Sequence, residues 1–494
     1  MQTPPTDPPR INQWKTLDKD LGRLGLLEQA TAYATRPLIA PSIALAFMVV
    51  VAIAVSAMMG WQSGTVLVVI ASVVGAYMAL NIGANDVANN MGPAVGANAL
   101  SLGGALVIAA VFETAGALIA GGDVVNTIAS GIVAPEAVSE PKVFVWAMLA
   151  ALLAAALWLN LATWLGAPVS TTHSIVGGVV GAGIVAAGMS AVNWPGVGRI
   201  AASWVISPVM GGVIAAVFLS FIKARILYRV DKLAAARRWV PVLIGVMAGT
   251  FAAYLALKGL SRVLRIELGM ALLIGLGGGV LAWLVSVPLI RRQSRGLENR
   301  KKSIRVLFAV PLVCSAALLS FAHGANDVAN AVGPLAAIVH TLRAGDVAAQ
   351  VSIPFWVLLI GAFGISFGLM LFGPRLIRLV GTQITKLNPM RAYCVALSAA
   401  ITVIIASWLG LPVSSTHIAV GAVFGVGFFR EWHAERRARL LNIRKGKPVP
   451  AEERKRRKLV RRSHFVTVAA AWVVTVPVSA LLAALIFFVF DAVG

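Results

Sequence analysis

The chain has 494 residues, of which 59% are hydrophobic and 12% are charged, and its mean hydropathy is +0.86. A soluble domain carries about 25% charged residues, so the composition excludes a soluble globular protein. The net charge of +23 would indicate nucleic acid in a soluble protein. Here the basic residues cluster between apolar runs, as they do in cytoplasmic loops of membrane proteins. The chain has 2 cysteines, too few for a disulfide framework or a cysteine-rich metal site. We therefore expect a multi-pass membrane protein with no nucleic-acid partner and no cofactor.

Apolar runs of about 20 residues, the length of a membrane-spanning helix, follow one another along the chain. They predict an all-α polytopic membrane protein with about 12 helices and one extra helix at the N-terminus. In chain order the predicted segments are a cytoplasmic N-terminal tail (1–36), the extra transmembrane helix (37–60), a first repeat (65–222), basic loops with two linking transmembrane helices (223–303), and a second repeat (304–490) that includes a basic cytoplasmic loop (430–462).

Four strongly basic stretches set the predicted topology, because positively charged loops stay in the cytoplasm. They are residues 223–238, 291–305, 375–391 and 430–462. Counting the crossings between them places the chain in the cell membrane with its N-terminus in the cytoplasm and its C-terminus outside. Two similar segments, in the two repeats, then cross in opposite directions. This pattern is an inverted-topology repeat with broken helices and helical hairpins, and is typical of secondary transporters with a site near the bilayer midplane.

The first repeated motif is GANDVANN at residues 83–90, which returns as GANDVANA at residues 324–331. Its glycine permits a break in the helix, and the polar residues that follow would then lie beside freed backbone carbonyls. These residues are Asn85, Asp86, Asn326 and Asp327. Such oxygen ligands suit a sodium ion or a proton, so the motif predicts a site for a coupling cation. The alternative is a buried aspartate that caps a broken helix.

The second repeated motif is PVSTTH at residues 168–173, which returns as PVSSTH at residues 412–417. Its proline suits the first turn of a new helix. Hydroxyl groups next to free backbone N–H groups at a helix N-terminus form an anion site. The hydroxyls are those of Ser170, Thr171, Thr172, Ser414, Ser415 and Thr416. One hydroxyl is enough for ordinary N-capping, so three in a row, twice, favour an anion site.

Other polar residues lie at membrane depth near these motifs. Glu113 is a further candidate for the cation site, because a carboxylate in a membrane is expensive unless it has a function. The histidines His173, His323 and His417 flank the motifs. We interpret them as hydrogen-bond partners of the site, with a role in proton transfer as the alternative, and expect no metal cluster from their spacing.

These motifs resemble the paired signatures of the inorganic phosphate transporter family, the PiT family, and VFETAGALIAGGDVVNTIASGIV at residues 111–133 resembles its next segment. The resemblance covers roughly residues 65–490. It implies phosphate uptake coupled to sodium or protons, an elevator-like or rocking movement, and a homodimer. It also implies that the two Asn-Asp pairs contact cation and phosphate, and that the six hydroxyl residues contact phosphate or cation. Where many relatives carry a polar residue, RAYCVALSAA at residues 391–400 has no carboxylate, which leaves Glu113 without a repeat partner.

The leading interpretation is a cation-coupled phosphate symporter, with sodium held by Asp86 and Asp327 if sodium is the ion. A sulfate permease on the same fold is the first alternative. An anion or solute channel is the second, because half-helices in inverted repeats also build pores, although two buried aspartates argue against it. An enzyme acting on lipid phosphates would need a nucleophile–base pair or an Arg/Lys clamp. The apolar segments contain neither, so we expect no enzyme.

Tags at Met1 and Gly494 test the predicted topology. An impermeant reagent should label the Gly494 tag on intact cells, and should reach the Met1 tag only after permeabilisation, because the predicted number of crossings is odd. Labelling of both tags from the same side would show that the count is wrong by an odd number.

Overall fold

The structure is a computed structural model, and it describes residues 38–60, 64–134, 137–138, 140–167, 169–259, 266–348, 350–383, 387–445 and 462–493. The chain divides into two compact units, Met1–Phe47 and Met48–Gly494. Residues 38–47 of the first unit are helical and begin the helix Leu38–Met59, within the predicted extra segment. The predicted tail, residues 1–36, lies outside the described residues.

Every named element in the described part of the chain is a helix. The described part of the chain has 11 helical spans that are long and apolar enough to cross a membrane, counting Leu38–Met59 and taking α11 and α12 together as Ala309–Ala344. The region of the first repeat contains α2 (Thr65–Gly96), α3 (Leu102–Ala120), α4 (Gly122–Ala129), α5 (Pro141–Leu165), α6 (Thr171–Ala187) and α7 (Trp194–Ile222). The linking helices are α8 (Lys232–Lys258) and α9 (Leu268–Gln293). The region of the second repeat contains α10 (Lys301–Leu307), α11 (Ala309–Asp327), α12 (Ala329–Ala344), α13 (Phe355–Gln383), α14 (Pro389–Trp408), α15 (Ser415–Lys445) and α17 (Arg462–Val493).

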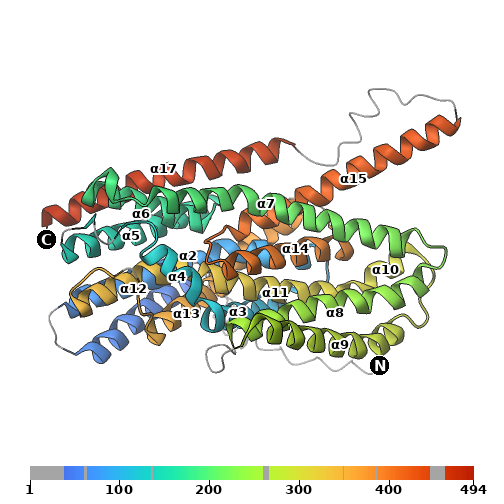
Figure 1. The fold of residues 1–494 in the computed structure, drawn as a ribbon, viewed down its shortest axis with the longest axis horizontal. Helices are drawn as coiled ribbons and strands as arrows, with labels where there is room; N and C mark the ends of the chain where they lie inside the picture. Colours follow the sequence, from blue (N-terminus) through green and yellow to red (C-terminus); the bar gives the residue numbers. More distant parts are fainter. Residues whose placement is uncertain are drawn as a thin grey trace, which may run out of the picture. The chain divides into compact units, whose positions relative to one another are not determined.

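The two repeats are interlocked. The helix that carries the first motif in each repeat packs against a helix of the other repeat: α2 against α13, and α11 against α3. The helices that begin at the second motif do the same, α6 against α17 and α15 against α7. Figure 1 shows these exchanged pairs, with red α17 beside teal α6 and orange α15 beside green α7. Each repeat therefore completes the core of the other.

Two helical hairpins, α5–α6 and α14–α15, present the second motif. Each hairpin turns at a glycine in the left-handed conformation, Gly166 with φ 71° and Gly410 with φ 67°. The amides after each first arm donate back to its last carbonyls, for example Ala167 to Ala162 at 2.8 Å and Leu411 to Ala406 at 2.9 Å. This is the glycine-terminated cap that ends many helices. The chain then starts a new helix with the hydroxyl residues in its first turn.

The prediction of a helix break at Gly83 is wrong, because α2 runs unbroken from Thr65 to Gly96. The second copy is interrupted at Val328, between α11 and α12, and not at Gly324. The motif glycines have another role. A Cβ on Gly83 would collide with the carbonyl oxygen of Ile365, and one on Gly324 with that of Glu113. The glycines therefore allow two buried helix backbones to touch, as small residues do in membrane proteins.

The first half of the predicted basic cytoplasmic loop at residues 430–462 is helical. Helix α15 continues past Arg430 as far as Lys445. The sequence of this extension is rich in Ala, Arg, Glu and Leu, which are strong helix formers, so the helix persists beyond its apolar part. Residues 446–461 lie outside the described residues.

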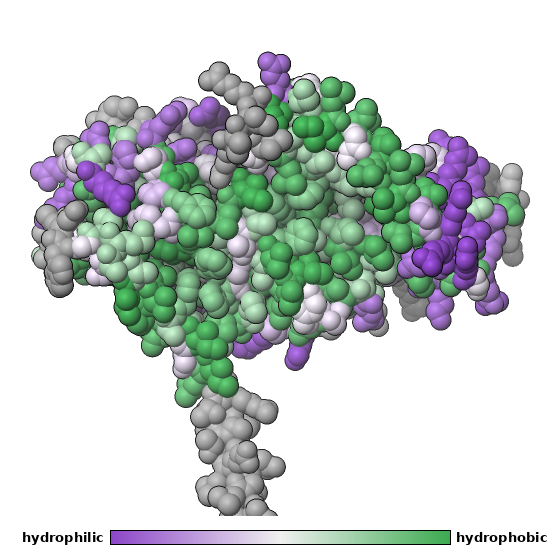
Figure 2. Space-filling model, turned by 90° about the horizontal axis from the view of Figure 1, so that it is seen from below, coloured by the Kyte–Doolittle hydropathy of each residue, from purple (hydrophilic) through white to green (hydrophobic). Residues whose placement is uncertain are grey.

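The surface of the helices fits a lipid environment. Figure 2 shows hydrophobic side chains across the middle of one face and hydrophilic ones toward its two ends. Helix α9 illustrates this. Only 11% of the residues in its most apolar segment are buried, and leucines such as Leu276 and Leu281 are largely exposed. An exposed apolar helix in a multi-pass chain is expected to face acyl chains.

The close approach at Gly324 gives a stability prediction. Gly324→Ala should lower the free energy of unfolding by about 1–3 kcal/mol, the usual effect of overpacking, because the added methyl meets the backbone of α3. Gly198→Ala is the matched control, since nothing lies within 4 Å of a Cβ at that position. Thermal denaturation of the detergent-solubilised variants measures both. Equal stability of the two variants would contradict the proposed close contact.

Candidate functional site

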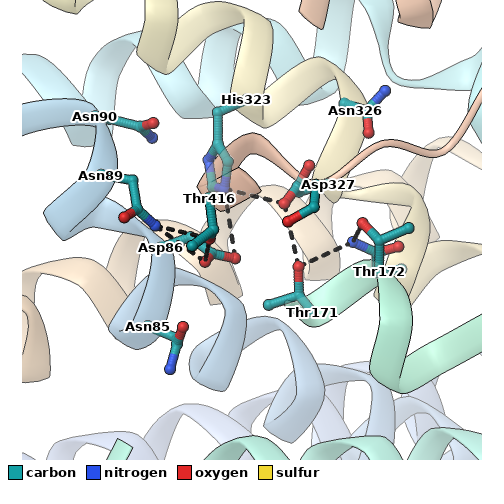
Figure 3. A network of polar contacts seen from close by, with 12 residues as sticks. Asn85, Asp86, Asn89, Asn90, Thr171, Thr172, His323, Asn326, Asp327 and Thr416 are labelled. Carbon is teal, nitrogen blue, oxygen red and sulfur yellow. Dashed lines mark hydrogen bonds and ion pairs between the residues drawn. The ribbon is translucent and has the colours of Figure 1, made fainter. Parts of the chain in front are cut away.

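The two motif aspartates lie close together at the centre of the helices, and both are fully buried. Asp86 comes from α2 and Asp327 from the end of α11. The first turns of α6 and α15 bring the hydroxyl residues to the same place (Figure 3). The structure therefore brings together in space the two motifs of both repeats, which are far apart in the sequence.

Asp86 is held by a residue of the opposite repeat. Its Oδ1 accepts a hydrogen bond from Thr416 Oγ1 at 2.9 Å. Asn89, one helical turn along α2, donates from Nδ2 to Thr416 Oγ1 at 2.8 Å and lies 3.5 Å from Asp86 Oδ1. The carboxylate, the amide and the hydroxyl thus form a closed group across the two repeats (Figure 3).

Asp327 has the mirrored arrangement. Its Oδ2 accepts a hydrogen bond from Thr171 Oγ1 of the first repeat at 3.2 Å. Asn330, the counterpart of Asn89, donates from Nδ2 to Thr171 Oγ1 and to Thr172 Oγ1, each at 3.3 Å. Sequence reasoning did not select these two asparagines. The signal was present, because each stands three residues after the aspartate in the repeated motif.

The asparagines next to the aspartates face the hairpin tips. Asn85 donates from Nδ2 to Thr163 Oγ1 on α5 at 3.2 Å. Asn326 donates to Ser407 Oγ at 2.9 Å and accepts from the amide of Val413 at 3.2 Å. Asn326 therefore fastens both sides of the α14–α15 turn to α11. The hydrogen bonds of these two side chains position the hydroxyl residues.

The hydroxyl residues fall into different groups. Ser170 and Ser414 are N-caps, which accept from the amides of His173 at 3.2 Å and His417 at 3.3 Å. Thr172 donates to the carbonyl of Val413 at 3.0 Å, so it joins the two hairpins to each other. Thr171 and Thr416 hold the aspartates as described above, and the hydroxyl of Ser415 is buried without a hydrogen-bond partner in the protein. Capping, the alternative that the sequence offered, thus describes the first serine of each motif.

His323 lies between the two aspartates. Its Nε2 is 3.2 Å from Asp327 Oδ2 and 3.7 Å from Asp86 Oδ2, and its Nδ1 is 3.3 Å from Glu113 Oε2. The other oxygen of Glu113 accepts from Asn90 Nδ2 at 2.9 Å. The expectation that no metal-ligand cluster forms is wrong, because one ligand atom from each of Asp86, His323 and Asp327 lies within 4.8 Å of the others. The cluster joins helices of both repeats. Spacing along a single helix therefore brings together His323 and Asp327, whereas Asp86 comes from α2 and cannot be predicted from that spacing.

Glu113 and His323 have no polar counterparts in the other half. Gly116 packs against the carbonyl of Phe321, and Gly368 packs in the same way against that of Leu80. By this correspondence, the position equivalent to Glu113 in the other repeat is Ile365 of α13. The position equivalent to His323 is Ile82 of α2. The missing carboxylate partner thus belongs to α13 and not to residues 391–400, as the sequence had suggested. One side of the site therefore has a polar pair where the other side has two isoleucines.

Several buried polar atoms at the site have no hydrogen-bond partner in the protein. They are Asn85 Oδ1, Asp86 Oδ2, Asp327 Oδ1, Asn330 Oδ1 and Ser415 Oγ, among others. A buried polar atom without a partner destabilises a protein by about 1–3 kcal/mol, so their collection in one place fits a site for a polar ligand. Carboxylate, amide and hydroxyl oxygens are ligands that hard cations prefer, and hydroxyl groups also donate to anions.

The remaining motif histidines lie behind the hairpin tips. The rings of His173 and His417 meet edge to face, with centres 4.4 Å apart. Trp204 of α7 packs its ring 3.8 Å from that of His173 and donates from Nε1 to the carbonyl of Pro412 at 3.1 Å. Trp204 thus touches the second motif of both repeats.

Comparisons with known proteins agree with this architecture. Residues 82–483 match the phosphate transporter family. A protein of Helicobacter pylori strain J99, provisionally named a phosphate permease, is 46% identical over 90% of this chain and 94% of its own. A provisionally named phosphate permease of Pyrococcus horikoshii is 37% identical over 86% of this chain and 98% of its own. A solved structure described as the sodium-dependent phosphate transporter has a TM-score of 0.78 at 35% identity, and covers 87% of this chain and 100% of its own.

Two interlocked repeats surround a buried cluster of carboxylate, amide and hydroxyl groups, which is the architecture of a membrane transport protein. The fold class predicted from the sequence is confirmed by the solved transporter. The chain belongs to the phosphate transporter family, as the motif resemblance predicted. Members of this family are transporters and not enzymes.

The cross-repeat bonds predict a specific coupling of mutations. In a double-mutant cycle, Asp86→Asn and Thr416→Val should interact by about 1 kcal/mol or more, because the first removes the charge of the acceptor and the second removes the donor of the same hydrogen bond. The control cycle combines Asp86→Asn with Thr250→Val. The Thr250 hydroxyl donates within α8, so the two changes in unfolding free energy should be additive. The free energy of unfolding in detergent measures both cycles. Additivity in both would contradict the contact between the repeats.

Proposed function

We propose that the protein is a secondary active transporter of the cell membrane that takes up inorganic phosphate together with sodium ions. The observation that carries this proposal is the pair of buried aspartates, each held by a threonine of the opposite repeat and each with an oxygen that lacks a hydrogen-bond partner. A site to which both inverted repeats contribute an aspartate and a threonine is suited to open toward either side of the membrane. The orientation that we propose has a cytoplasmic N-terminus and an external C-terminus.

The proposed cation ligands are Asp86 and Asp327, with Asn85, Asn326 and Glu113 as further contributors. Their oxygens suit a hard monovalent ion, and the solved relative is described as sodium-dependent. The proposed phosphate contacts are the six hydroxyl residues at the starts of α6 and α15, together with the two asparagines. The helix N-termini there add backbone N–H groups and a favourable dipole for an anion.

Charge balance gives a physical reason for symport. In the described part of the chain, the ion pairs of Asp86 and Asp327 involve His323 and no lysine or arginine. Phosphate entering beside two carboxylates would be repelled strongly in a buried site of low dielectric constant. Bound cations offset this repulsion, so phosphate binds tightly only when the cations are already bound. The cations and phosphate are then transported together.

A proton is the second candidate for the coupling ion, and the position of His323 favours it. An imidazole between two carboxylates and in contact with Glu113 can accept a proton. A protonated histidine would supply the positive charge that sodium supplies in the first proposal.

Uptake into proteoliposomes tests the proposal. Labelled phosphate should accumulate inside when sodium is imposed outside, and an imposed proton gradient without sodium should drive little uptake. Accumulation with the proton gradient alone would make the proton the coupling ion. Sulfate in large excess should compete poorly, because phosphate keeps a proton near neutral pH that a carboxylate can accept. Equal competition by sulfate would favour a sulfate permease, and equilibration without either gradient would favour a channel.

A further inference from the structure

A groove runs between α7 and α15 on the outer side of the helices. It has a volume of about 820 Å³, and its lining is almost wholly apolar. Residues such as Trp204, Val209 and Val213 on α7, and Phe428 and Trp432 on α15, line it. Glycines let the two helices approach here, since a Cβ on Gly425 would collide with the backbone of Gly212. Val209 and Val213 are each about 60% exposed, so a partner from the membrane can reach the groove.

One end of the groove is surrounded by positive charges. Lys223 Nζ lies 4.8 Å from the centre of the Phe429 ring, which also lines the groove. Lys223 is close enough to Arg430 and to Arg391 for electrostatic repulsion among them. Glu431 interacts with Arg430, but none of the ion pairs between described residues includes Lys223, Arg391 or Arg430. Half-buried cations that repel one another favour an anion at this place.

We propose that this groove binds an anionic phospholipid, with an acyl chain between α7 and α15 and the headgroup phosphate at Lys223, Arg391 and Arg430. The dimensions agree, because α7 rises about 18 Å between Trp204 and Ala216, close to the ~15 Å depth of one leaflet. The basic end begins two stretches, 223–238 and 430–462, that the sequence predicts to be cytoplasmic. The cytoplasmic leaflet is the one that is rich in anionic lipids. A neutral lipid or an apolar helix would not need the three cations.

The other end of the groove reaches the transport site. Trp204 lines the groove, packs on His173 and donates to the carbonyl of Pro412. A lipid that packs against Trp204 therefore supports the residue that touches the second motif of both repeats. We expect the lipid to influence how firmly the two hairpin tips are held, and hence the rate of transport.

Native mass spectrometry of the full chain in detergent tests the binding site, with phosphatidylglycerol and phosphatidylethanolamine as probes. The wild type should retain phosphatidylglycerol preferentially. The double variant Lys223→Gln, Arg430→Gln should retain it at least about tenfold more weakly, because two charges near the phosphate are removed. The matched control is Arg291→Gln, Arg292→Gln, which removes two exposed charges at the end of α9 and should retain the lipid like the wild type.

A second pair of variants tests the groove without changing charge. Val209→Trp should fill the groove and reduce retention of phosphatidylglycerol, whereas Val246→Trp, in the groove between α8 and α9, should not. Equal retention by the wild type, the Lys223–Arg430 variant and Val209→Trp would overturn the proposal. The proposal would also be overturned if the wild type formed dimers without bound lipid and Val209→Trp were monomeric. That result would assign the groove to a second copy of the chain.

Reconstitution extends the test to activity. Phosphate uptake by the wild type should be several-fold faster in vesicles that contain phosphatidylglycerol than in vesicles of the zwitterionic lipids phosphatidylcholine and phosphatidylethanolamine. The Lys223–Arg430 variant should lose this difference and keep the uptake seen in the neutral vesicles. A wild type whose uptake is the same in both vesicles would contradict the proposed influence on transport. Binding is measured separately, so absence of all uptake would count against the proposed transport function and not against the lipid site.

Discussion

Two carboxylates buried within a few ångströms of each other are the constraint on which the rest of this structure depends. A charge at membrane depth is strongly destabilising unless it is paired or faces a polar cavity. Here each aspartate is compensated by a threonine hydroxyl from the opposite repeat, by the helix N-terminus on which that threonine stands, and by His323 between them. None of these partners lies near its aspartate in sequence except His323, so the whole chain must fold before the charges are stabilised.

The interlocking of the repeats follows from this constraint. Each aspartate needs the hairpin of the other repeat, and each hairpin helix, α6 or α15, packs against a late helix of the other repeat. The motif glycines bring the aspartate helices against α3 and α13 with backbone in contact. Local symmetry fails in one place, where Glu113 and His323 correspond to Ile365 and Ile82. This is where the two halves of the site differ chemically.

The sequence was sufficient for the fold, because its two repeats carry the same motifs. The repeated motifs marked the aspartates and the hydroxyl residues, and basic loops ordered the helices. Two errors have tertiary causes. Gly83 suggested a broken helix from local flexibility, whereas the packing of α13 decides that a glycine is needed there. His323 looked peripheral because two of its three partners, Asp86 and Glu113, lie on other helices. After Arg430 the cause is local, because the helix propensity of the residues in the predicted loop extends α15 to Lys445.

The central claim is that Asp86 and Asp327 are two halves of one cation site, and phosphate uptake per folded molecule in Asp86→Asn, Asp327→Asn and the double variant tests it most directly. Asparagine keeps the shape and one ligand oxygen but removes the charge that a cation needs, which is worth several kcal/mol in a buried site. Each single variant should remain folded and lose sodium-driven uptake by at least about a hundredfold, and the double variant should be no worse. A well-folded double variant with wild-type uptake would contradict the account.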